Sequence, residues 1–265
     1  MPDAAESVLR VDGLRKAYGA TRAVDDVSFD LAPGQSLGIV GESGSGKTTT
    51  ARIVVGLERP DAGTVTVNGR DRTERRGGAA ARLARAREVQ MVFQDPFLSL
   101  DPRITVGAAI REPLALHFPG RDHGARVGEL LDQVGLGGRH AAALPRQLSG
   151  GQRQRVAIAR ALAVEPAVLV LDEAVAALDV SVQAQILNLL ADIRERTGVG
   201  YLFITHDLGV VRFVTEQVVV MRRGQVVEAG PTATVLADPR HPYTRLLLDS
   251  VPRPGWDPRE LAGRR

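Results

Sequence analysis

The residues that most directly indicate chemistry form one loop, Gly41 to Thr48, with the pattern G-x-x-x-x-G-K-[ST]. It follows an apolar run, 37–40, and precedes a helix-compatible segment, 49–56. In this setting glycines let successive backbone N–H groups surround phosphate oxygens, and the helix N-terminus favours negative charge. Lys47 would bridge the β- and γ-phosphates of a nucleoside triphosphate, and the Thr48 hydroxyl would hold Mg²⁺. A flexible glycine turn is the alternative, but Lys47 is one of only two lysines in this chain.

A pair of carboxylates follows an apolar run farther along the chain. Residues 168–171 are typical of a parallel strand covered on both faces, and Asp172 comes at its carboxyl end, where such sheets bind ligands. Asp172 is therefore predicted to hold Mg²⁺ together with Thr48. Because strand-end side chains alternate in direction, Glu173 would face the water that attacks the γ-phosphate and act as its general base. A pair of acids that caps the next helix is the alternative interpretation.

Two further polar residues end apolar strands. Gln94 follows residues 89–93, and its amide could contact Mg²⁺ and the attacking water at once. His206 follows residues 200–205, and its imidazole could sense the γ-phosphate, although a lone histidine in such a place is more often structural. The other four histidines lie in loop-like or helical stretches and are assigned no role.

A second glycine turn, Leu148-Ser149-Gly150-Gly151-Gln152, opens a predicted helix. A serine hydroxyl, exposed N–H groups and a helix N-terminus together form another potential anion site. One triphosphate has no obvious use for two such sites in one chain. Either this turn is an ordinary helix cap, or it binds a nucleotide held by another subunit.

The composition excludes several classes of protein. The chain of 265 residues is 44% apolar and 25% charged, as soluble globular proteins are. Its apolar runs stay short of the roughly 18–20 residues of a membrane span, and its first six residues lack signal-peptide character. The absence of cysteine excludes disulfides, cysteine-ligated zinc and iron–sulfur clusters. A net charge of +3, with arginines interleaved among acids, does not favour nucleic-acid binding, and a cytosolic location is the simplest fit.

Sequence periodicity predicts the elements that position these residues. Alternating patterns predict strands over 8–11, 23–31 and 63–67, the last closed by an Asn68-Gly69 hairpin. Continuous apolar runs predict buried strands over 89–93, 167–171 and 200–205, and a final hairpin joins 217–221 to 225–229.

The other segments are predicted to be mainly helical or exposed. Residues 97–163 are mostly helical, with interruptions at Pro113, Pro119, Gly124 and Gly135 to Gly138, and are predicted to form a lobe inserted into an α/β core. Residues 70–88 are predicted to be a solvated loop and an exposed helix. The tail from Pro231 is expected to pack against the outside.

Taken together, these motifs resemble the ATPase subunit of ATP-binding cassette (ABC) transporters. In that family a phosphate loop, a glutamine loop, an LSGGQ signature, a strand ending in Asp-Glu, a D-loop and a switch histidine occur in this order. The matching residues here are Gly41 to Thr48, Gln94, Leu148 to Gln152, Val168 to Glu173, Ala177 to Asp179, and His206. The resemblance runs from about Leu9 to the C-terminus. It implies that two subunits pair head to tail, with each ATP between one phosphate loop and the other subunit's signature.

The resemblance implies roles residue by residue. Glu173, His206 and Gln94 would be catalytic, Thr48, Gln94 and Asp172 would bind Mg²⁺, and Tyr18 would stack on adenine. The residues implied to bind ATP are Tyr18, Gly41, Glu42, Ser43, Gly44, Ser45, Gly46, Lys47, Thr48, Thr49, Ser149, Gly150, Gly151, Gln152 and Asp179.

The resemblance also implies the architecture. The expected fold class is α/β, with a P-loop NTPase (RecA-like) core, an N-terminal antiparallel β subdomain and an inserted α-helical subdomain. Within a single domain, 1–265, residues 1–96 and 164–235 would form the catalytic core and 97–163 the helical subdomain. Residues 236–265 would be a C-terminal tail.

Three stretches narrow the resemblance to the oligopeptide/dipeptide/nickel importer branch: Val92 to Pro96 with Ser99 to Arg103, Leu178 to Gln185, and His241 to Leu247. Some members of that branch carry a cysteine cluster in the tail, which this chain lacks. The usual D-E-P-T-S-A-L-D is also altered, to D-E-A-V-A-A-L-D at 172–179. This change removes a proline and two hydroxyls, at Val175 and Ala176, that could form hydrogen bonds across a dimer.

The expected function is ATP hydrolysis at a dimer interface that powers import of peptides or a related small solute, nickel included. The expected partners are permease subunits, which dock on the loop after Gln94 and the helical lobe, a second ABC ATPase subunit, and an extracytoplasmic solute-binding protein, but not nucleic acid. The expected location is peripheral, on the cytoplasmic face of the plasma (inner) membrane. Two alternatives are a weakly hydrolysing regulatory subunit of an asymmetric pair and a soluble ABC ATPase that acts on nucleic acid or ribosomes.

Overall fold

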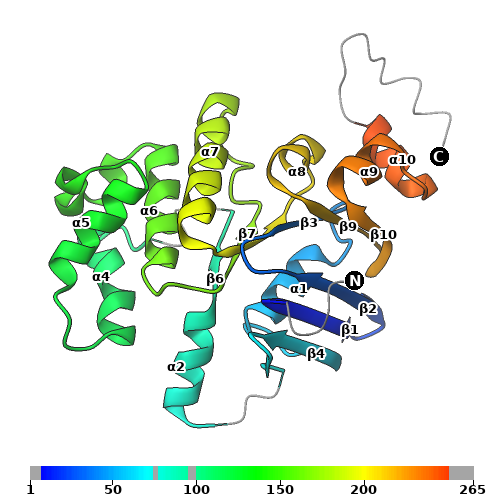
Figure 1. The fold of residues 1–265 in the computed structure, drawn as a ribbon, viewed down its shortest axis with the longest axis horizontal. Helices are drawn as coiled ribbons and strands as arrows, with labels where there is room; N and C mark the ends of the chain where they lie inside the picture. The colour runs from blue at the N-terminus through cyan, green and yellow to red at the C-terminus, as the bar shows by residue number, and fades with distance from the viewer. Residues whose placement is uncertain (1–6, 74–76, 95–99, 251–265) are drawn as a thin grey trace.

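A computed structural model describes residues 7–73, 77–94 and 100–250, which form two β-sheets with helices around them (Figure 1). The strands are β1 (Leu9–Tyr18), β2 (Thr21–Leu31), β3 (Ser36–Val40), β4 (Ala62–Val67), β5 (Arg70–Asp71), β6 (Val89–Val92), β7 (Val168–Asp172), β8 (Gly200–Ile204), β9 (Gln217–Arg222) and β10 (Gln225–Pro231). The helices are α1 (Lys47–Val54), α2 (Ala79–Glu88), α4 (Val106–His117), α5 (His123–Gln133), α6 (Gly150–Leu162), α7 (Val180–Thr197), α8 (Leu208–Val214), α9 (Thr232–Ala237) and α10 (Pro242–Asp249), with 3₁₀ turns at Gly138–Ala142 and Pro145–Gln147. The predicted features at Asp95 to Ser99 and the tail beyond residue 250 lie outside the described residues.

The smaller sheet is antiparallel, with the strand order β2-β1-β4-β5. The Asn68-Gly69 turn joins β4 to β5, as predicted. The first strand reaches Tyr18 and is longer than predicted. The predicted strand stops at Val11 because the pairing with β2 becomes irregular there. Gly13 has φ 57° at this point, so the apolar alternation breaks while the hydrogen-bonded ladder resumes beyond it.

The larger sheet has the strand order β10-β9-β3-β8-β7-β6, and all its neighbours except β9 and β10 are parallel. Every residue of β3, β7 and β8 is buried, which explains why their sequences are continuous apolar runs rather than alternating ones. The carboxyl ends of β3, β6, β7 and β8 therefore share one edge of the sheet, with β3, β8 and β7 adjacent to one another.

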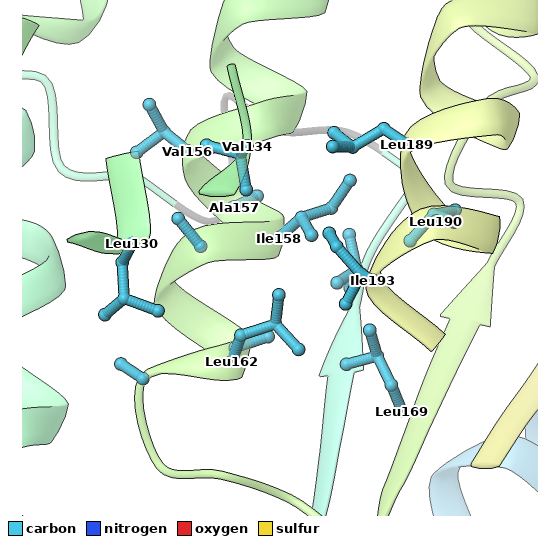
Figure 2. Packing of buried hydrophobic residues seen from close by; sticks show 14 of the residues in the cluster. Leu130, Val134, Val156, Ala157, Ile158, Leu162, Leu169, Leu189, Leu190 and Ile193 are labelled. Carbon is cyan, nitrogen blue, oxygen red and sulfur yellow. The ribbon is translucent and has the colours of Figure 1, made fainter. Parts of the chain in front are cut away.

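Helices α4, α5 and α6 form a lobe beside the larger sheet, between β6 and β7 in the chain (Figure 1). Figure 2 shows Ile158 and Leu162 of α6 facing Leu189 and Ile193 of α7 and Leu169 of β7. All five belong to one buried cluster, and burying each such side chain contributes about 1.5–3 kcal/mol. This packing fixes α6, and with it the glycine turn at its N-terminus, relative to the sheet.

The predicted interruption at Pro113 is wrong, because α4 continues through it. Proline cannot donate a hydrogen bond to the preceding turn, which usually breaks a helix. Here Val106, Ile110 and Leu114 are buried on both sides of Pro113, so packing holds the helix together. Helix α2 agrees with its prediction, since none of its residues is buried.

The C-terminal elements pack on the side of the larger sheet away from the helical lobe (Figure 1). Tyr243 of α10, Val235 of α9 and Leu208 of α8 share a buried cluster with Val40 of β3 and Val220 of β9. The sequence predicts a tail that packs against the outside, and its described part covers the outer side of the larger sheet, with Val235 and Tyr243 buried against it. Over the described residues, no helix is both long and apolar enough to cross a membrane.

Candidate active site

Three adjacent strand ends carry the predicted chemical residues. Strand β3 pairs with β8 with Ile39 opposite Ile204, and β8 pairs with β7 with Asp172 opposite the same Ile204. The phosphate loop, the Asp172-Glu173 pair and His206 therefore leave the sheet side by side, at the carboxyl edge where parallel sheets bind ligands. The structure brings together three motifs that are far apart in the sequence.

Two glycines let the phosphate loop pass close to neighbouring backbone. Gly41 has φ 153° and Gly46 has φ 104°. A Cβ atom at either position would lie 2.2 Å from a carbonyl oxygen, that of Met221 or that of Ala23 respectively. Only glycine follows this path without displacing its neighbours. Gly46 is the N-cap of α1, and no side chain caps this helix, so its first-turn N–H groups remain for an anion.

The Lys47 side chain folds back over the loop and is 6% exposed. Its Nζ donates to the carbonyl oxygens of Gly41 at 2.7 Å and Glu42 at 2.8 Å. Burial lowers the pKa of Lys47, whereas the carboxylates of Glu173 and Asp172 oppose that shift. The ammonium is thus held by carbonyl dipoles beside an uncapped helix N-terminus, an arrangement suited to a phosphate group.

The remaining loop residues differ in exposure. Ser45 is buried and Thr49 is half-buried. Four residues are exposed: Glu42, Ser43, Gly44 and Thr48.

Asp172 is almost fully buried, with 8% of the residue exposed. Within the described part of the chain its Oδ1 atom has no hydrogen-bond partner. Burial, and after it the charge of Glu173, raises the pKa of Asp172, whereas Arg52, Lys47 and the Thr48 hydroxyl favour the charged form. A buried carboxylate with a free oxygen close to a threonine hydroxyl is a suitable environment for a hard cation.

Glu173 and His206 contact each other directly. The Nδ1 atom of His206 lies 3.0 Å from Oε1 of Glu173. Glu173 has φ 47°, a conformation that is uncommon for residues other than glycine, and its N–H donates to the Ile204 carbonyl at 2.8 Å. This bond ties the strained residue to β8. The histidine side chain is 61% exposed, so the pair opens to solvent on the His206 side.

Gln94 and Tyr18 lie at the periphery of this group. Gln94 is exposed two residues beyond β6, whose Val92 lies opposite Leu171, so it leaves the same sheet edge. Among the described residues, no hydrogen bond joins it to Thr48 or Asp172. Tyr18 is 49% exposed, and its hydroxyl donates to Glu58.

A lysine covers Tyr18, the aromatic residue predicted to stack on adenine. The Lys16 Nζ lies 5.6 Å from its ring centroid and is paired with Asp61 at 3.1 Å. The Thr49 side chain also acts on Tyr18 by a hydrogen bond that lowers its pKa, against the larger raising effect of Glu58. Tyr18 therefore lies beside α1, the helix that the phosphate loop opens.

The signature turn caps helices within its own chain. Ser149 is the N-cap of α6, where its Oγ accepts from Gln152 N–H at 3.2 Å and its N–H donates to Gln152 Oε1 at 2.9 Å. A Cβ on Gly151 would lie 2.5 Å from Val182 of α7, whereas Gly150 has more room. Asp179 similarly caps α7 by accepting from Val182 N–H at 2.9 Å. These residues lie apart from the phosphate loop, to which no hydrogen bond joins them over the described ranges.

Comparison with known proteins decides the family. The family model described as ABC transporter matches residues 24–176, more than half of the chain. The chain belongs to the ABC transporter family. A second model, described as oligopeptide/dipeptide transporter, C-terminal region, matches residues 227–265. This match confirms that the ABC transporter subunit belongs to the oligopeptide/dipeptide importer branch.

Individual relatives of this ABC transporter subunit support the same family assignment. A putative peptide import ATP-binding protein of Brucella abortus is 49% identical over 263 residues, which cover 95% of this chain and 78% of the relative. The glutathione import ATP-binding protein GsiA of Escherichia coli is 49% identical over 246 residues, which cover 92% of this chain and 39% of GsiA. A solved dimeric ATP-binding cassette, bound to ADP and Pi in a post-hydrolysis state, is 30% identical with a TM-score of 0.75, over 84% of this chain and 98% of that one.

These comparisons confirm the resemblance, the fold class and the ATP-hydrolysing nature of the ABC transporter subunit. ATP-binding subunits of this family bind nucleotide and work with permease subunits. The roles assigned to individual residues stay predictions.

One contact in the ABC transporter site was not predicted from the sequence. The Tyr243 hydroxyl of α10 accepts the Glu42 N–H of the phosphate loop at 3.0 Å. The only signal was the His241 to Leu247 stretch, whose resemblance to the importer branch gave no hint of what it touches.

Proposed function

We propose that Glu173 is the general base when this subunit hydrolyses ATP, and that hydrolysis drives import of a peptide, a related small solute or nickel through separate permease subunits. The observation that carries the proposal is the convergence of Lys47, Asp172 and Glu173 at one edge of the parallel sheet. The names of the relatives, which specify peptide and glutathione import, support the cargo class.

The geometry supports distinct roles for the residues that follow β7 and β8. The hydrogen bond from His206 to Oε1 orients the Glu173 carboxylate and leaves its other oxygen for a water molecule. Glu173 then takes a proton from that water as the water attacks the γ-phosphate. Lys47 donates two of its three ammonium N–H groups to loop carbonyls, and the third can donate to phosphate oxygens, so its positive charge lies where negative charge develops.

The residues present also fit Mg²⁺. The free Oδ1 atom of Asp172, the Thr48 hydroxyl and the amide oxygen of Gln94 are all oxygen ligands, the type that Mg²⁺ prefers. When bound, the ion would neutralise charge on the β- and γ-phosphates. Asp172 and Thr48 would hold it from the strand and the loop, while Gln94 would approach from the exposed end of β6.

We further propose that the working site lies between two subunits. One ATP would contact the phosphate loop of one subunit and Ser149 with the adjoining glycines of the other. The position of Ser149 at the start of α6, a helix of 13 residues, supports this role because helix N-termini attract phosphate. The dimeric state of the ADP-bound relative is consistent with it.

Mixing two inactive variants tests the dimer. Lys47→Met and Ser149→Arg should each abolish hydrolysis alone, and their mixture should recover up to about a quarter of the wild-type rate. Half of randomly formed dimers combine one copy of each, and one of the two sites in such a dimer is intact. The measurement is phosphate release with Mg²⁺ and ATP. A mixture that stays inactive while wild type is active would contradict head-to-tail pairing of this chain with itself.

An apolar groove supports a docking surface for the permease. It lies between α2, β6, α4 and α6, and Leu57 and Phe93 line it with 61% and 40% of their surfaces exposed. Large exposed apolar side chains beside a groove are typical of helix-binding surfaces. An amphipathic cytoplasmic helix of the permease would fit here. The subunit would thereby lie peripherally on the cytoplasmic face of the inner membrane. On the other side of the membrane, an extracytoplasmic solute-binding protein would deliver the cargo to the permease.

Uptake into vesicles tests the cargo. With its permeases and solute-binding protein, the chain is expected to support ATP-dependent uptake of a labelled di- or oligopeptide. The matched control is the same complex with the Glu173→Gln subunit, which should show background uptake only. Nickel uptake without peptide uptake would reject peptides as the cargo, and uptake of neither would reject both cargo classes.

The structure also bears on the altered D-E-A-V-A-A-L-D segment. Ala174 and Val175 are each only 6% exposed and belong to the core cluster of the helical lobe, whereas Ala176 is exposed. Val175 thus contributes packing within its own chain rather than facing a second subunit. Of the two hydroxyls that the segment lacks, only the one at Ala176 would lie on the surface, which favours an active subunit over a regulatory one.

A further inference from the structure

The first peptide group of the phosphate loop is held from both sides. Its carbonyl, that of Gly41, accepts from Lys47 Nζ at 2.7 Å. Its N–H, that of Glu42, donates to the Tyr243 hydroxyl at 3.0 Å. In a trans peptide these two groups point in opposite directions, so the peptide plane lies between Lys47 and Tyr243.

Tyr243 is fixed where it makes this contact. The residue is 2% exposed, and its ring packs in a cluster with Val40, the residue just before the loop, and Val220, which pairs with Val40 across the sheet. The Arg222 guanidinium lies 4.7 Å from the ring centroid. Burial raises the pKa of Tyr243, so the hydroxyl keeps its proton and offers an oxygen lone pair to the peptide N–H.

The backbone before Tyr243 is also held in place. His241 Nδ1 accepts the Tyr243 N–H at 3.1 Å and so caps α10, which begins with Pro242. The Glu228 carboxylate of β10 accepts the N–H groups of Arg240 at 2.8 Å and His241 at 3.1 Å. The helix therefore starts at a defined point relative to β10, and the Tyr243 side chain extends from that point to the loop.

We propose that Tyr243 is a positioning residue for nucleotide binding. By fixing the orientation of the Gly41–Glu42 peptide, its hydroxyl fixes the carbonyl that holds the Lys47 ammonium before phosphate arrives. A lysine side chain has four rotatable bonds, and holding it in place beforehand lowers the entropy lost on binding. The match to the oligopeptide/dipeptide C-terminal region begins at residue 227, so this contact assigns a role at the phosphate loop to that region.

Tyr243→Phe tests the inference, because phenylalanine keeps the buried ring and removes only the hydroxyl. We expect the dissociation constants of MgATP and MgADP, measured by calorimetric titration of the full chain, to rise about three- to tenfold, the effect of one lost hydrogen bond. The KM for ATP should rise by the same factor while kcat changes little, since the contact acts before chemistry.

The matched control is Tyr201→Phe. Tyr201 is also buried, at 1% exposed, and its hydroxyl donates to the Leu190 carbonyl at 2.9 Å, a contact outside the loop. Thermal unfolding of both variants shows whether they lose similar stability, and only Tyr243→Phe should lose nucleotide affinity. Unchanged affinity in Tyr243→Phe, or an equal loss in both variants, would overturn the role of Tyr243. The inference rests on the proposed phosphate-loop site, which fails separately if the wild-type chain binds no nucleotide.

Discussion

Glu173→Gln is expected to reduce ATP hydrolysis by about 10²-fold or more while leaving ATP binding intact. A general base contributes roughly 10²–10⁴-fold to a rate, and glutamine keeps the shape of glutamate but takes up no proton. Its amide oxygen can still accept from His206, so the local structure should survive. Phosphate release measured with Mg²⁺ and ATP, on the chain alone or with its partner subunits, gives the rate, and calorimetric titration gives the affinity.

Glu165→Gln is the matched control for this variant. Glu165 is also a glutamate in a left-handed conformation, with φ 54°, but it lies on the surface, where it pairs with Arg87 at 3.2 Å. Surface ion pairs of this kind contribute little, so its activity should stay near wild type. An unchanged rate in Glu173→Gln would reject the general-base assignment. Equal losses in both variants would show that any glutamate-to-glutamine change perturbs the enzyme.

The parts of the fold that periodicity predicts are those in which one local cause dominates. Strands β3, β7 and β8 are buried on both faces, so their sequences are apolar throughout and easily identified. Gly198 ends α7 with φ 69°, as a C-cap glycine should. The failures come from tertiary context. Gly13 interrupts the alternation of β1 without ending the strand, and packing carries α4 through Pro113.

The site residues that were predictable follow from one rule. Chemical side chains come just after parallel strands, and parallel strands end at the same edge, so Asp172, Glu173 and His206 could be grouped before any coordinates were known. The Tyr243 contact could not be predicted in this way, because its partner Glu42 is 201 residues away and both atoms involved are common groups. Sequence shows which groups can react, whereas long-range packing determines what holds them in place.

Gly46→Ala is expected to weaken MgATP binding by about 100-fold or more. Alanine at φ 104° is strained, and its Cβ would also lie 2.2 Å from the Ala23 carbonyl oxygen, so the loop or β2 would have to move. Moving the loop displaces both the Lys47 ammonium and the first-turn N–H groups of α1. The loss of these groups as phosphate ligands weakens binding further, beyond the intrinsic cost of the left-handed backbone, which alone is about 1–2 kcal/mol.

Gly44→Ala separates the two causes. Gly44 also has a positive φ, 78°, so alanine there also meets backbone strain, but nothing lies within 4 Å of its added Cβ. Its binding should weaken by only about 5- to 30-fold, the equivalent of that strain. Titration of both variants with MgATP, with circular dichroism to verify folding, compares them directly. Equal losses would mean that backbone strain alone decides the loop's conformation. A markedly larger loss in Gly46→Ala would show that close packing against β2 holds the phosphate loop in its binding shape.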